Sequence, residues 1–233
     1  MKIATDLHIH SCLSPCGDME MTPNNLVNMA FLKGLDAIAL ADHNTAKNLP
    51  AAKAVADARD LVLVPAIEAE SREEVHVLCY FRTVEDALEM GDFLYEHLPP
   101  MPNMPSMFGE QIAMNDDDEP IYTEEKLLIQ ATTLSINEIA EKCRELGGVP
   151  VPAHINRTSN SLIASLGFIP PECDFTTVEV YRSIPLENVD VSPYHVIFSS
   201  DAHNLEAIFE RDNFISVEER SVEGILKYLA SKK

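Results

Sequence analysis

Short apolar runs alternate with amphipathic segments along the whole of this 233-residue chain. The runs have the length of buried strands and cover residues 38–40, 61–64, 75–80, 149–151, 177–180 and 196–198. The segments between them are long enough for helices. Strands that alternate with helices are typical of βα units around a parallel sheet, and they argue against a helical bundle or a β-sandwich. The pattern therefore predicts an α/β fold.

Several of the predicted helices have recognisable ends. One begins at Thr22, which a proline follows, and stops at Gly34. Another begins with a capping box made by Ser135 and Glu138. A last amphipathic helix follows Ser221, and its apolar stripe is expected to pack on the barrel that the strands form.

Residues 99–133 interrupt the alternation with prolines at positions 99, 100, 102 and 105 and an acidic run at positions 116–119. We interpret this segment as an insertion in a single domain that spans residues 1–233. The acidic run predicts a turn between two short strands at 111–114 and 120–122, with a cation site as the alternative. An insertion close to the mouth of a barrel would also be placed to act as a lid.

Composition narrows the class of protein. The apolar content of 46% is that of a globular chain, and no stretch approaches the roughly 18 apolar residues that span a bilayer. The five cysteines form no CxxC pair, so neither a disulfide framework nor a thiolate zinc site is predicted. These features predict a soluble, cytoplasmic protein with free, mostly buried thiols. The oligomeric state stays open.

The formal net charge of −21 repels polyanions, and it argues against DNA, RNA or an anionic membrane as a partner. It favours a small substrate instead. A solvated acidic surface that only keeps the protein soluble is the simpler explanation of the same charge.

Polar side chains recur where the apolar runs end. The five places are Asp6-Leu7-His8-Ile9-His10, Ala41-Asp42-His43-Asn44, Ala66-Ile67-Glu68, Pro152-Ala153-His154 and Ser200-Asp201-Ala202-His203. Parallel strands all end at the same face of an α/β fold, so these side chains are expected to converge. Side chains two apart on a strand also project to the same side. The pattern predicts a metal cluster.

The residue types indicate which metals would bind. Imidazole nitrogen and carboxylate oxygen together suit zinc, manganese or iron, whereas calcium takes oxygen ligands alone. His76 lies within an alternating strand and by itself is ambiguous. We interpret His97, at a helix end, and His195, at the N-terminal end of a strand, as structural residues.

Taken in order, these motifs resemble the signatures of the PHP (polymerase and histidinol phosphatase) family of metal-dependent phosphoesterases. The likeness extends over nearly the whole chain, with Glu68 and His76 between the second and third signatures. It implies a distorted, TIM-like (β/α)7 barrel of seven strands, with two or three divalent metal ions in its mouth.

The resemblance also implies a ligand set. A first ion would take His8, His10, Glu68 and Asp201, and a second would share Glu68 and add His76 and His154. His43 and His203 would hold the third ion together with Asp18, while Cys16 is the alternative because the loop differs in length from the family pattern. Outside the ligand set, Arg157 is a candidate for binding a substrate phosphate, and an ordinary ion-pair role is the alternative.

The predicted function is hydrolysis of a small phosphate ester or nucleotide by a water that the metal ions activate. The ions would make the pocket locally positive and attract a phosphate dianion. The alternatives are an exonuclease that acts on DNA or RNA ends, a non-catalytic metal-binding PHP module, and a hydrolase of C–N bonds. The sequence names neither the substrate nor the metal.

Overall fold

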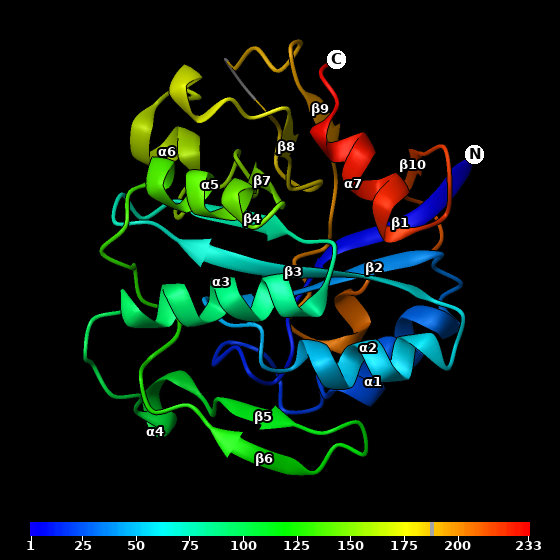
Figure 1. Ribbon diagram of the computed structural model, residues 1–233, viewed down its shortest axis with the longest axis vertical. Coiled ribbons are helices and arrows are strands. Elements are labelled where there is room, and N and C mark those ends of the chain that lie inside the picture. Colours follow the sequence, from blue (N-terminus) through cyan, green and yellow to red (C-terminus); the bar gives the residue numbers. More distant parts are fainter. Residues whose placement is uncertain (187–188) are drawn as a thin grey trace.

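The computed structural model describes residues 1–186 and 189–233. A six-stranded sheet lies at its centre, with the strand order β10-β1-β2-β3-β4-β7 (Figure 1). Its strands are β1 (Lys2–Ile9), β2 (Ala37–His43), β3 (Val62–Glu70), β4 (His76–Tyr80), β7 (Val149–Pro152) and β10 (Phe214–Ser216). Two further ladders stand apart, and they are β5 (Ile112–Met114) with β6 (Pro120–Thr123) and β8 (Thr177–Glu179) with β9 (His195–Ile197). All six predicted strands are present, whereas β1 and β10 have no counterpart among the six predicted runs.

The central sheet is mixed, so the expectation of an all-parallel sheet was wrong. Strands β1, β2 and β3 are parallel, but β4 runs antiparallel to β3, and β7 runs antiparallel to β4. Only residues 71–75 connect β3 to β4. A parallel crossover needs a dozen residues or more, so this short connection forces a hairpin.

The sheet curls into a half-barrel, and the predicted seven-stranded ring is not confirmed. The β8–β9 pair adds no ladder to the central sheet. Ile155 N–H, after β7, donates to Glu179 O of β8, and His10 N–H, after β1, donates to Ala202 O beyond the end of β9, each at 2.9 Å. Both β8 and β9 are three residues long, which leaves few backbone groups for a continuous ladder. Within the described ranges the hydrogen-bonded ladders therefore do not close.

Helices cover the outside of the sheet and fill its concave side. They are α1 (Pro23–Leu32), α2 (Leu49–Asp57), α3 (Val84–Glu96), α4 (Pro105–Phe108), α5 (Ile136–Glu145), α6 (Leu162–Leu166) and α7 (Val222–Ala230), with short 3-10 turns at Pro171–Cys173 and Leu205–Ala207. The predicted caps are confirmed. Thr22 Oγ1 accepts from Asn25 N–H at 3.2 Å, and Ser135 forms the capping box with Glu138. None of the helices in the described part of the chain is both long and apolar enough to cross a membrane.

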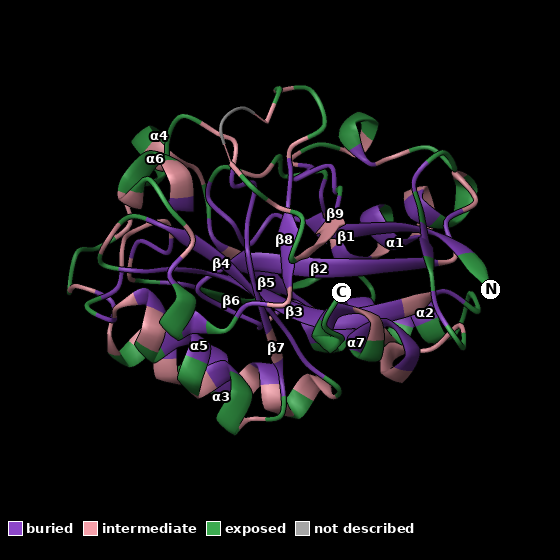
Figure 2. Ribbon diagram, turned by 90° about the horizontal axis from the view of Figure 1, so that it is seen from above, coloured by how far each residue is buried: buried purple, intermediate pink, exposed green. Residues whose placement is uncertain are grey.

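Alternate positions of each strand feed two cores. Ile38 and Leu40 of β2 pack with the outer helices, whereas Ala37, Ala39 and Ala41 face the inner core with apolar side chains of α7. Figure 2 shows the strands buried between helices whose outer faces are exposed. The small alanines leave room for the α7 side chains in this core, and the predicted packing of the last helix is confirmed.

Residues 99–133, which we predict to be an insertion, form α4 and the β5–β6 hairpin, and the two strands predicted there are confirmed. The acidic turn of this segment is held against the start of α1. Asp118 Oδ2 accepts from Thr22 Oγ1 at 2.6 Å, and Oδ1 accepts from Asn24 N–H at 3.0 Å. This docking gives part of the acidic run a structural role.

Candidate metal centre

Eight predicted ligand side chains meet at the edge where the parallel strands end. They are His8, His10, His43, Glu68, His76, His154, Asp201 and His203. Strands β1, β2 and β3 bring the first four to this edge because they run in the same direction. His76 arrives from the opposite direction, as the first residue of antiparallel β4, so the β3–β4 hairpin settles the ambiguity that its sequence position left.

Glu68 lies at the middle of the cluster. Its carboxylate faces five imidazoles at nitrogen–oxygen distances from 2.8 to 3.4 Å, those of His76, His154, His43, His10 and His8. The side chain is 1% exposed. A buried carboxylate that is shared among so many rings has the position of a ligand that bridges two ions.

Hydrogen bonds on the outer side of the rings fix which nitrogen faces inward. His8 Nδ1–H donates to Glu179 Oε2 at 3.1 Å, and His10 Nδ1–H donates to Ser14 Oγ at 2.9 Å. Ser14 Oγ–H in turn donates to Asp42 Oδ1 at 2.7 Å, so its oxygen is free to accept. Both Nε2 atoms therefore point into the cluster with a free lone pair.

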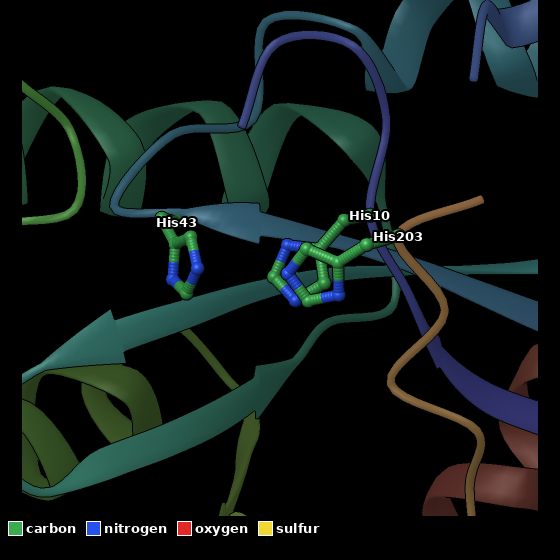
Figure 3. A group of neighbouring side chains, drawn as sticks. All are labelled: His10, His43 and His203. Atoms are coloured by element: carbon green, nitrogen blue, oxygen red, sulfur yellow. The ribbon is translucent and has the colours of Figure 1, made fainter. Parts of the chain in front are cut away.

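The inward nitrogens are too close to one another to be left without a cation or a proton. His8 Nε2 and His10 Nε2 are 3.1 Å apart, and Asp201 Oδ1 is 3.1 Å from His10 Nε2. Figure 3 shows the rings of His10, His43 and His203, which come from three segments of chain. Converging lone pairs of this kind fit divalent ions with nitrogen and oxygen ligands.

Unpaired buried atoms support the same fit. His43 Nδ1, His154 Nδ1 and Asp201 Oδ1 have no hydrogen-bond partner among the described residues. Buried polar atoms are nearly always paired, because an unpaired one costs about 1–3 kcal/mol. Bound cations would engage lone pairs of this cluster.

The electrostatics of the cluster call for positive charge. Burial lowers the pKa of His8, but the carboxylates of Glu179 and Glu68 outweigh burial and raise that pKa well above its ordinary value. Burial also opposes protonation of His76, yet Glu68 and Glu70 raise its pKa to about 10. Protons thus take the lone pairs that cations would use, and the two compete for the same sites.

Two of the predicted ligands have a backbone conformation that is rare outside glycine. His154 has φ 26° and Asp201 has φ 52°. Such conformations cost about 1–3 kcal/mol each and collect at functional sites, where the surrounding structure enforces them.

A cavity of about 240 Å³ opens over the cluster. Arg157 lines it together with Asn160, Cys16 and several of the predicted ligands. The Arg157 guanidinium pairs with Asp201 Oδ2 at 2.8 Å and stacks on Tyr181 at 4.3 Å. Its predicted role in binding a phosphate stays a prediction, since the ion-pair alternative is also present.

Comparison of the sequence with protein-family models and with curated proteins gives no match. Solved structures give several. The lesion-specific endonuclease Q from Pyrococcus furiosus has a TM-score of 0.65 at 19% identity, over 100% of this chain and 57% of that one. A protein from Bifidobacterium adolescentis assigned as a metal-dependent phosphoesterase has a TM-score of 0.63 at 18% identity, over 97% of this chain and 96% of that one.

A two-domain protein from Bacteroides vulgatus contains a predicted PHP-like metal-dependent phosphoesterase. It matches with a TM-score of 0.55 at 16% identity, over 98% of this chain and 62% of that one. This chain has the PHP-like phosphoesterase fold. The resemblance in the sequence motifs and the likeness in structure thus agree on the fold. The chain spans 57% of the length of endonuclease Q, so the activity of that whole protein is not carried over.

The argument from charge against a nucleic-acid partner was wrong. Endonuclease Q has the same PHP-like fold, and its complex with a 27-mer duplex holds an abasic lesion at the active site. Net charge acts at long range and is screened within about 8 Å at physiological salt, whereas a bound strand responds to the local charge of metal ions and arginines. A charge of −21 therefore does not exclude nucleic acid from a PHP-like site.

Asp18 is the predicted ligand that the PHP-like fold does not bring into the cluster. It is exposed, and only its backbone contacts the site, through a 2.8 Å bond from its N–H to His203 O. Cys16, the alternative in the same loop, has its sulfur 3.1 Å from His203 Nε2.

The neighbouring aspartates act on loops more than on rings. The Asp6 carboxylate accepts from the N–H groups of Ser200 and Phe209 and so holds the loop that carries Asp201. Asp42 reaches His10 only through Ser14.

Glu179 has a role that sequence reasoning missed. Besides holding His8, its carboxylate accepts from His154 N–H at 2.8 Å, so it orients two predicted ligands. Its place at the end of β8 was the available signal, because every other strand end near the cluster supplies a functional side chain.

Proposed function

We propose that this chain hydrolyses phosphoric esters with two or three divalent ions held at the cluster. The observation that carries the proposal is the arrangement of five imidazoles around the buried Glu68 carboxylate, in a PHP-like fold. We assign His8, His10, Glu68 and Asp201 to the first ion, which is a group whose ligand atoms lie within 4.8 Å of one another. Glu68, His76 and His154 would serve the second ion, and His43 and His203 the third.

Bound ions would supply an activated water and neutralise negative charge on the phosphoryl oxygens. The residues of the chain would orient the imidazole rings and exclude bulk water. Glu179 and Ser14 keep two rings turned inward, and the buried strand ends keep bulk water away from the ligands. With Asp201 engaged by an ion, its pairing with Arg157 would be weaker, and the guanidinium would be available to a phosphate oxygen.

We infer a small phosphate ester or a nucleotide as the substrate, since the cavity of about 240 Å³ over the cluster has room for a phosphoryl group with a small leaving group. A nuclease is the second candidate, because endonuclease Q holds duplex DNA in the same fold. The predicted compartment remains the cytoplasm, where the free thiols of this chain would stay reduced.

The test begins with protein stripped by a chelator and reloaded separately with zinc, manganese or iron. We expect reloading to restore hydrolysis of at least one ester in a panel of sugar phosphates, mononucleotides and aryl phosphates. His8→Ala and Asp201→Ala should each lower kcat/KM by more than about 100-fold, because each removes a ligand. His97→Ala is the matched control and should keep full activity, since its ring bonds to Phe93 O outside the site.

The choice of substrate is tested with the same loaded protein. Mononucleotides are compared with single-stranded and duplex oligonucleotides, with and without an abasic site, across a salt series. Turnover of oligonucleotides alone would replace the small-substrate proposal with a nuclease. Turnover of amides alone would make the protein a hydrolase of C–N bonds, and metal binding without turnover of any substrate would leave a non-catalytic module.

A further inference from the structure

The third group of metal-binding side chains lacks an acid. His10, His43 and His203 place ring nitrogens within 4.8 Å of one another, and the other two such groups each include Glu68. His10 is already assigned to the first ion, so the third would have two neutral imidazoles, those of His43 and His203. They leave the charge of a divalent ion uncompensated and a tetrahedral site incomplete. The missing ligand should be an anion at the cavity edge of this group.

The Cys16 sulfur lies at the cavity edge of this group. Its Sγ lies 3.1 Å from His203 Nε2, and Cys16 lines the same cavity as His43 and His203. His43 adds an independent sign of a ligand. The residue is only 6% exposed, and its ring nitrogen Nδ1, 3.1 Å from Glu68 Oε2, makes no hydrogen bond among the described residues. The carboxylate of Asp18, by contrast, makes no contact with the group among the residues described.

The loop that carries the thiol is held in one conformation. Gly17 N–H donates to Ser14 O at 2.8 Å, and a Cβ at Gly17 would lie 2.5 Å from Ser11 O, so only glycine fits this turn. Gly109 of the insertion packs against Pro15 O just as tightly. With the bond from Asp18 N–H to His203 O, these contacts fix Cys16 beside the imidazoles before any ion binds.

We propose that the thiolate of Cys16 is the anionic ligand of the third ion, together with His43 and His203. The inference rests on the proposed function in that it takes the other ions to bind at the same cluster. The thiol loses its proton when an ion binds. Sulfur ligation makes this site select zinc or iron over magnesium and manganese, whereas the other two groups offer only nitrogen and oxygen.

Cobalt(II) substitution tests the ligand without any assay of activity. The loaded wild-type protein should show a sulfur-to-cobalt charge-transfer band in the near ultraviolet, and Cys16→Ser should lose it and bind its last ion at least about tenfold more weakly. Asp18→Asn is the matched control from the same loop and should keep both the band and the ion content. X-ray absorption of the zinc-loaded wild type should show one sulfur at about 2.3 Å.

Each outcome bears on the assignment. A fully loaded wild type without the band, or a Cys16→Ser protein that keeps it, would overturn the proposal, as would loss of the third ion in Asp18→Asn alone. Cys16→Asp separates a lost ligand from a lost fold, because it should regain the third ion without regaining the band. Failure of the phosphoesterase function would leave the cobalt spectrum unchanged, so the two proposals fail separately.

Discussion

Glu179 illustrates how a single side chain outside the ion-binding set governs it. The carboxylate lies 171 residues from His8 in the chain, yet it fixes which nitrogen of that ring faces inward. Burial raises the pKa of Glu179, but His8 outweighs burial and lowers it, so the carboxylate stays ionised. A charged acceptor behind a ligand makes the imidazole a better donor to the ion.

Glu179→Gln should therefore weaken ion binding about 10- to 100-fold while the fold is retained. Glutamine keeps an oxygen for the two bonds that Glu179 Oε2 accepts, from His8 Nδ1–H and His154 N–H, but its amide carries no negative charge. Without that charge behind it, the His8 imidazole is a poorer donor to the ion. Competition with a chromophoric chelator measures the change. Glu172→Gln, an exposed acid nearby, is the control, and equal affinities of the two variants would contradict the role of Glu179.

At the scale of elements, short connections determine which side chains reach the site. The β3–β4 hairpin reverses the chain and so delivers His76 to the cluster from the start of a strand. The insertion hairpin docks its turn on the start of α1 through Asp118. It also reaches the cavity, which Ile129 lines, and Gly109 packs against the loop that carries Cys16. The insertion is thus placed to shape the site.

Asp118→Asn should destabilise the protein by about 1 kcal/mol, because the amide replaces one of the two accepting oxygens and removes the charge that strengthens both bonds. Asparagine tolerates the left-handed backbone at this position, where φ is 60°, so lost bonds rather than strain would explain the effect. Chemical denaturation measures it. Asp117→Asn, at the exposed neighbouring position, should change stability little, and a similar loss in both variants would argue against the docking.

At the scale of the whole molecule, contacts between the two ends of the chain hold the curled sheet. Asp36, just before β2, accepts from Ala4 N–H of β1 at 2.7 Å and pairs with Arg211, just before β10, at 2.9 Å. Burial raises the pKa of Asp36, but the Arg211 and Ala4 bonds outweigh it and lower the pKa below its ordinary value of 3.8. The ionised carboxylate therefore stabilises the folded chain.

This linkage predicts a pH dependence. The contribution of Asp36, about 1 kcal/mol for a partly exposed pair, is present in full above pH 3.8 and is lost as the pH falls through the lower, folded pKa. Thermal unfolding of wild type and Asp36→Asn should differ by a constant amount from pH 7 to 5, and the two should converge at more acidic pH. A difference in stability between the two proteins that persisted in acid would show that the ionised Asp36 carboxylate does not stabilise the folded chain.

Local chemistry explains what the sequence by itself determined. Caps at Thr22 and Ser135 and the buried runs of the strands depend on residues a few positions apart, so their pattern sufficed to predict the elements. The motifs at strand ends predicted the ligands for the same reason, because a strand carries its last side chains to the sheet edge wherever the sheet lies. Eight of these predicted ligand side chains meet in the structure.

Only the tertiary structure decided the rest, because it depends on how distant segments meet in space. The turn at residues 71–75 made the sheet mixed, and short β8 and β9 left the barrel half closed. No local pattern places Glu179 behind His8 or chooses Cys16 over Asp18 beside His203, since two positions in one loop differ only in the direction that the folded loop gives them. The residue types limited which ligands and acids the site could contain, and the packing of the folded chain decided which of them lie at the cluster.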